Sequence, residues 1–218
     1  MSSEPAAATL RVVRPGRVSY TEALGLQRAA AAALRDGSGP ETLFLLEHEP
    51  VVTLGRRARD DGHLLLPREE FARRGVLVVE TDRGGDVTYH GPGQIVGYPI
   101  FDLRRRRSGP REHLRHLEQV LIDVLRSEYA LDAFRDPEHT GVWTRAGKIA
   151  AMGIRVSGGV SLHGFALNVA PELPGFGMIV PCGIQGRAVA SMAELLGTTP
   201  PLEQVMDHLE DAFRRSTP

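Results

Sequence analysis

The sequence is poor in the features that mark several large classes of protein. It has a single cysteine in 218 residues, which excludes an intrachain disulfide and any metal site built from several cysteines. No apolar run approaches the ~20 residues that span a bilayer, and the N-terminus lacks a secretory signal pattern. With 26 basic and 27 acidic residues, the net charge is −1, so no global field draws the chain to nucleic acid or to a membrane. We expect a cytoplasmic protein that recognises its partners locally.

The length of 218 residues predicts one domain, and the mixture of helical and strand patterns places it in the α/β (α+β) class. The expected elements are an edge strand at 10–13, a helix from the capping box at Ser19 and Glu22 to about Arg35, two β runs over 42–55 broken at Glu49-Pro50, a short helix at 67–74, a buried strand at 76–80, and a helix at 111–129 that covers one face of the sheet. His48 falls at the break and is either a polar turn residue or a ligand. The basic run at 104–107 lacks interleaved aromatic residues, which favours a solvated loop over a nucleic-acid site.

A glycine-rich stretch between Arg83 and Ile100 carries most of the polar character of the middle of the chain. Five glycines surround Arg83, Thr88, Tyr89 and His90. Glycine favours turns and crowded backbone, so one interpretation is a hairpin with glycine turns between two strands. The other is a loop whose N–H groups and polar side chains bind a carbonyl or carboxylate.

A second hairpin is predicted by two β-like runs around Gly158-Gly159. Counting outward from that turn pairs Ala151 with Ala166, Met152 with Phe165 and Gly153 with Gly164, and it sets Lys148 opposite Val169. Lys148 then ends an apolar stripe with Ala150, Met152, Ile154, Phe165 and Leu167. It either snorkels to water at the sheet rim or is held away from water, where the neutral amine could accept a proton. The glycine pair leaves space for a packed helix or for a ligand chain.

The lone cysteine, Cys182, stands between Pro181 and Gly183. Proline stiffens the turn, and the N–H of Gly183 could stabilise an oxyanion on an acyl group held by the sulfur. A thiol needs a nearby base or cation to become a nucleophile, and no histidine lies within a few residues. Taken alone, Cys182 is either an inert buried thiol or a nucleophile whose base comes from elsewhere in the chain.

Five segments considered together decide between these interpretations. EHEPVVTLGR, RGGDVTYHGPGQ, GKIAAMGIRV, HGFALNV and IVPCGI resemble, in order and spacing, the lipoyl(octanoyl)transferase family, the octanoyl-acyl-carrier-protein:protein octanoyltransferases. The resemblance is strongest over residues 43–196. It implies a mixed, largely antiparallel central sheet with flanking helices, similar to the fold of biotin and lipoate protein ligases.

The resemblance also implies the site. It identifies Cys182 as the acyl-thioester nucleophile and Lys148 as the residue that lowers the pKa of its thiol. The substrate-binding residues that it implies are Arg83, Gly84, Gly85, Asp86, Val87, Thr88, Tyr89 and His90, together with Ala151, Met152, Gly153, Gly164, Phe165 and Ala166. The counted register makes the last two triplets cross-strand partners.

The reaction implied by the resemblance moves an octanoyl (or lipoyl) group from acyl carrier protein to a lysine of lipoyl domains, in 2-oxoacid dehydrogenase E2 subunits and glycine cleavage H protein. It is the first step of endogenous protein lipoylation. Because one thioester replaces another, we expect no ATP, metal or other cofactor. Two alternatives remain: an octanoyl amidotransferase acting between lipoyl-domain proteins, and a non-catalytic module that binds lipoyl domains.

Overall fold

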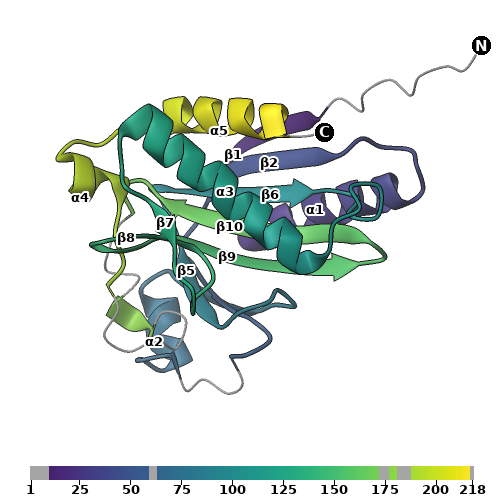
Figure 1. Cartoon of the computed structure of the whole chain (residues 1–218). Helices are drawn as coiled ribbons and strands as arrows, with labels where there is room; N and C mark the ends of the chain where they lie inside the picture. The colour runs from purple at the N-terminus through teal and green to yellow at the C-terminus, as the bar shows by residue number, and fades with distance from the viewer. Residues whose placement is uncertain (1–9, 59–62, 172–176, 181–187, 217–218) are drawn as a thin grey trace, which may run out of the picture.

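A seven-stranded mixed sheet forms the centre of the computed structural model, which describes residues 10–58, 63–171, 177–180 and 188–216 (Figure 1). In this sheet β1 and β2 pair in parallel, whereas the other neighbouring strands are antiparallel. The strand order is β1 (Arg11–Val18), β2 (Thr42–His48), β6 (Gln94–Ile100), β10 (Val160–Asn168), β9 (Gly147–Ser157), β8 (Val142–Thr144) and β7 (Phe134–Arg135). The expected mixed, largely antiparallel sheet is confirmed, and β1 is its edge.

A smaller three-stranded sheet lies beside the large one. Its order is β4 (Leu77–Glu80), β3 (Val51–Leu54) and β5 (Val87–His90), and the short helix α2 (Arg68–Arg73) packs with it. The predicted strand at 76–80 is present as β4, but the expectation that it is buried is wrong, because β4 is an edge strand and Leu77 is 52% exposed. The glycine-rich stretch is likewise not a hairpin: β5 pairs with β3, and β6 pairs with β2 and β10.

Helices cover both faces of the large sheet (Figure 1). On one face α3 (Pro110–Tyr129) packs against α5 (Leu202–Ser216), and the ring of Phe165 stacks on Phe213 with 5.9 Å between centroids. On the other face α1 (Tyr20–Arg35) joins the core that contains Ala166, which follows Phe165 and therefore points the opposite way. The short helix α4 (Met192–Leu196) precedes α5. As predicted, Ser19 caps α1, and its hydroxyl accepts a hydrogen bond from the Glu22 N–H; among the described contacts this is the half of the predicted capping box that forms.

The predicted register of the β9–β10 hairpin is confirmed from Ser157 opposite Val160 to Ala151 opposite Ala166. Beyond Ala150 the prediction is wrong. β10 ends at Asn168, and the backbone of Lys148 bonds to residues 188 and 190 instead of facing Val169. On its other side β9 pairs Ala150 with Val142 but Lys148 with Trp143, so Ile149 is an extra residue at a bulge. A bulge shifts the alternation of side chains, and this moves Lys148 off the apolar stripe.

The arginine run at 104–107 lies in a turn and is mostly exposed, as expected of a solvated loop. Arg106 is the exception: its guanidinium pairs with Glu41 at 2.5 Å and lies 3.8 Å from the centroid of the Phe101 ring. Within the described ranges, no helix combines the length and the apolar character needed to cross a membrane.

Candidate active site

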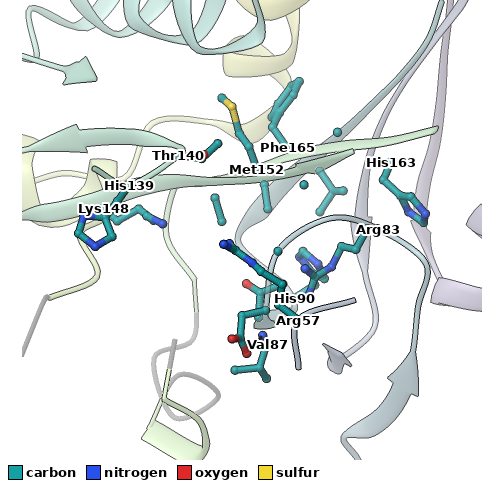
Figure 2. Close-up of a pocket in the computed structure, with 18 of the residues that line it drawn as sticks. Arg57, Arg83, Val87, His90, His139, Thr140, Lys148, Met152, His163 and Phe165 are labelled. Carbon is teal, nitrogen blue, oxygen red and sulfur yellow. Dashed lines mark hydrogen bonds between the residues drawn. The ribbon is translucent and has the colours of Figure 1, made fainter. Parts of the chain in front are cut away.

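A cavity of about 440 Å³ lies between the α1 side of the large sheet and the small sheet (Figure 2). Its size is within the range of small-molecule sites. Its walls include Lys148 and most of the predicted substrate-binding residues: Arg83, Gly85, Asp86, Val87, Thr88, His90, Ala151, Met152, Gly153, Gly164, Phe165 and Ala166. Two predicted residues, Gly84 and Tyr89, do not line it, and Cys182 lies outside the described residues.

The Arg83 side chain holds the glycine loop against the small sheet. Its Nε and Nη2 donate to the hydroxyl of Thr53 at 3.1 and 2.8 Å, and Nη2 also donates to the Thr53 carbonyl at 2.6 Å. Nη1 donates to the Gly84 carbonyl at 3.0 Å. Most N–H donors of this buried guanidinium therefore bond to protein oxygens. Arg83 holds the glycine loop in place and also contributes positive charge to the cavity.

The glycine loop is joined to the hairpin by backbone contacts. The N–H of Gly84 donates to the Ile154 carbonyl at 2.9 Å, and a Cβ on Gly153 would lie 2.5 Å from the Gly84 carbonyl oxygen. The space beside Gly153 is thus filled by another loop, and not by the packed helix or ligand chain expected from the sequence. Gly164 is constrained similarly, since its Cβ would lie 2.2 Å from the Gly97 carbonyl oxygen. The glycine loop and the hairpin therefore meet because Gly153 lacks a side chain, whereas Gly164 allows β10 to lie close to Gly97 of β6.

Tyr89 points into the core of the small sheet, with Phe71 and Met178 in the same cluster. Gly91 makes room for its phenol ring, because a Cβ there would lie 2.4 Å from the hydroxyl oxygen. Since side chains alternate along a strand, His90 faces the other way and lines the cavity. The tyrosine of the TYH motif therefore has a packing role in this structure.

His90 is a buried, neutral histidine. Burial is the main cause that holds its pKa well below the usual value, and nearby His48 and Arg83 lower the pKa further. Its Nδ1 lies 3.2 Å from Oε1 of Gln94. The amide nitrogen of Gln94 donates to Asn168 and to the Tyr89 carbonyl, so Oε1 accepts and the proton of His90 is on Nδ1. This leaves Nε2 of His90 as a hydrogen-bond acceptor.

A second group of buried polar side chains completes this wall, and sequence reasoning missed most of it. His48 Nδ1 donates to the Val18 carbonyl at 3.0 Å, and burial lowers its pKa to about 4. Its Nε2 is therefore bare and accepts from the Tyr98 hydroxyl at 2.7 Å. Burial also raises the pKa of Tyr98 well above 10. His48 is therefore not the polar turn residue considered from the sequence: it is fully buried at the end of β2, outside the cavity wall, and its hydrogen bond supports Tyr98, which lines the cavity.

His163 and Tyr20 form a parallel arrangement. The pKa of His163 is lowered to about 4, first by burial and then by Arg83 and neighbouring arginines. Its Nε2 donates to Asp82 at 2.7 Å, Asp82 also pairs with Arg155, and its Nδ1 lies 3.4 Å from the Tyr20 hydroxyl. The residues brought to the cavity from outside the five motif segments are Tyr20, Arg57, Val96, Tyr98, Glu138, His139 and Thr140, whereas His163 begins the segment HGFALNV. They come from segments far apart in the sequence.

Lys148 lies on the cavity side of β9 because of the bulge at Ile149. Figure 2 shows Met152 and Phe165 pointing away from Arg83, whereas Lys148 lies by the cavity. The amine of Lys148 is 4.8 Å from the centroid of the Trp143 ring. The aliphatic part of its side chain lies beside Gly141, where an added Cβ would be 3.3 Å from Cε of Lys148. The residue is half-buried, between the snorkelling and fully desolvated positions considered from the sequence.

The cavity wall also includes part of a carboxylate–histidine group. Ligand atoms of Asp136, Glu138 and His139 lie within 4.8 Å of one another. However, Oδ1 of Asp136 already accepts hydrogen bonds from the backbone N–H groups of Glu138 and His139, and it contacts Nδ1 of His139. This geometry is that of a side chain capping a turn.

Comparison with known proteins identifies the family of the chain. The sequence profile of the lipoyl protein ligase A/B catalytic domain matches residues 19–214. An octanoyltransferase from Chloroflexus aggregans is 48% identical over 204 residues, covering 92% of this chain and 91% of that protein.

Two solved structures match the fold. A lipoate-protein ligase A bound with ATP superposes with a TM-score of 0.71 at 16% identity, covering 96% of this chain and 85% of that one. A biotin protein ligase from Aquifex aeolicus superposes with a TM-score of 0.54 at 10% identity, covering 94% and 68%. The chain thus has the fold of the lipoate and biotin protein ligases. It belongs to the lipoyl protein ligase A/B catalytic family, within which its sequence groups with the octanoyltransferases.

Proposed function

We propose that this chain transfers an octanoyl group from acyl carrier protein to a lysine of lipoyl domains, through a thioester on Cys182. One observation supports this most directly: the only motif lysine of the hairpin, Lys148, lines the same cavity as the glycine loop and both small-residue triplets. Ala151 and Ala166 are cross-strand partners there, and they provide a small apolar surface for an acyl chain.

In the first half-reaction, the Lys148 amine accepts the thiol proton and the Cys182 thiolate attacks the carbonyl carbon of the octanoyl thioester. The bond from that carbon to the carrier sulfur breaks, and the leaving thiolate takes the proton from the Lys148 ammonium. In the second, the acceptor amine attacks the Cys182 thioester and gives a proton to Lys148. The Cys182 thiolate leaves and is reprotonated. The Gly183 N–H would stabilise the oxyanion in both steps.

Variants of Lys148 separate proton transfer from charge. Arg keeps the charge but cannot accept a proton near neutral pH, and Met removes both properties. If Lys148 transfers protons, K148R and K148M should each lose about 10²-fold in rate while remaining folded. The matched control is R145M, because the Arg145 side chain is 91% exposed and its only described ion pair, with Asp132, is long and solvated. Near-normal transfer by K148R would show that Lys148 is not the base.

Intact-mass measurement tests the donor and the nucleophile. Purified protein mixed with octanoyl-carrier protein should gain one octanoyl group, and Cys182→Ala should gain none. Acylation only from an octanoylated lipoyl domain would favour the amidotransferase alternative. Lipoyl-domain binding without any acylation would favour the non-catalytic one.

A further inference from the structure

Arg57 is an exposed arginine at the wall of the cavity. It follows β3, lines the cavity, and in Figure 2 its side chain extends into the space with the guanidinium directed to the side where Lys148 lies. Across the described ranges, no hydrogen bond or ion pair is made by this guanidinium, whereas that of Arg83 is bound to Thr53 and Gly84. Arg57 was not among the residues indicated by sequence motifs.

The backbone beneath Arg57 is fixed to the glycine loop. The N–H of Arg57 donates to the Gly85 carbonyl at 3.0 Å, and the N–H of Arg56 donates to the Arg83 carbonyl at 3.0 Å. Gly55 allows this approach, since a Cβ there would lie 2.5 Å from the Gly85 carbonyl oxygen. The backbone of Arg57 is therefore held in place at the cavity wall, so its side chain loses less conformational entropy when the guanidinium binds a ligand.

The acids of the cavity do not neutralise Arg57. Asp86 accepts from the Val87 N–H at 2.7 Å and contacts Nδ1 of His63 at 2.7 Å, so its Oδ1 is occupied. Glu138 is exposed, and in the part of the chain that the structure describes it forms no ion pair with Arg57. The wall therefore holds two permanent cations, Arg57 and Arg83, and of these two it is the Arg57 guanidinium that has no partner among the described residues. Such a guanidinium at the cavity wall attracts an anionic substrate group.

We propose that Arg57 binds the phosphate of the pantetheine arm that carries the acyl group. This inference rests on the proposed function, in which the thioester of the donor reaches Lys148. A planar guanidinium binds phosphate through two parallel hydrogen bonds, which suits an anion that must be held in one orientation. Anchoring the phosphate end of the arm at Arg57 limits the positions that the thioester at the other end can reach.

The test compares donors that differ by the phosphate alone. Octanoyl-phosphopantetheine and octanoyl-pantetheine carry the same thioester, and octanoyl-carrier protein adds the protein surface. The variants are R57Q, which keeps polar contacts but removes the charge, and R57K, which keeps the charge but loses the two-pronged geometry. The control is R56Q, because Arg56 is exposed, adjacent and not part of the cavity wall.

The measured quantity is the ratio of kcat/KM for octanoyl-phosphopantetheine to that for octanoyl-pantetheine. R57Q should lower this ratio about tenfold or more, R57K should lower it less, and R56Q should preserve it. An unaltered ratio in R57Q overturns the inference, and so does an equal fall in R56Q. A loss in R57Q seen only with the carrier protein would assign Arg57 to the carrier surface and overturn the phosphate assignment. Failure of the unaltered enzyme with all three donors would instead refute the proposed function.

Discussion

Buried histidines should make this protein sensitive to acid, and His113 allows the effect to be measured away from the cavity. His113 lies on α3 with 2% of its surface exposed, its ring meets Phe101 edge-on, and its Nε2 has no hydrogen-bond partner among the described residues. Burial lowers its pKa to about 3, and the charges of His116 and Arg106 contribute in the same direction. The neutral ring is therefore the form compatible with the folded state.

The sign of the pH dependence follows from this shift. The pKa is about 3 in the folded protein and about 6.5 when unfolded, so the unfolded chain takes up the proton first as the pH falls through 6.5. The free energy of unfolding therefore decreases as the pH falls from about 6.5 to about 3, the pKa of His113 in the folded protein. At 1.4 kcal/mol for each pH unit, a fall to pH 5 costs about 2 kcal/mol for His113. His48 and His163, with pKa values of about 4, each add about as much.

Replacing His113 with Phe keeps the ring and removes the titration. Free energies of unfolding from urea titrations should show the advantage of H113F over the unaltered protein growing by about 2 kcal/mol between pH 7.5 and pH 5. Titration of the carboxylates is common to both proteins and cancels. Equal transfer activity at pH 7.5 would confirm that the cavity is unchanged. An advantage that stays constant with pH would refute the assignment of a neutral buried His113.

Two further substitutions test the packing of the cavity walls. Gly153→Ala should displace the Gly84 loop and lower the rate of transfer for acyl groups of every chain length. A shift of preference towards shorter acyl groups would contradict this explanation. The control is Gly25→Ala, which lies in open space on α1 and should be stabilising by up to ~1 kcal/mol. Tyr98→Phe should cost about 1–3 kcal/mol in urea unfolding because Nε2 of His48 loses its donor, and a cost near zero would show that this hydrogen bond contributes no net stability.

Local chemistry in the sequence was sufficient to determine several features. The Gly158-Gly159 turn and the two-residue period of strands placed Ala151 opposite Ala166, because register within a hairpin depends only on the turn and on counting. The cap at Ser19 and the apolar spacing of α3 act within a few residues, so those helices were also predictable. The motifs likewise indicated most of the cavity wall.

Other features were decided only by tertiary structure. The position of Lys148 depends on one extra residue, Ile149, opposite a strand that no local pattern aligns with it. The reason for Gly153 is the carbonyl of Gly84, about 70 residues away in the chain, and a missing side chain does not reveal which neighbour fills its place. The neutrality of His48 likewise comes from burial beneath several elements. Contacts between distant segments depend on how the sheets pack, and no count along the sequence contains that information.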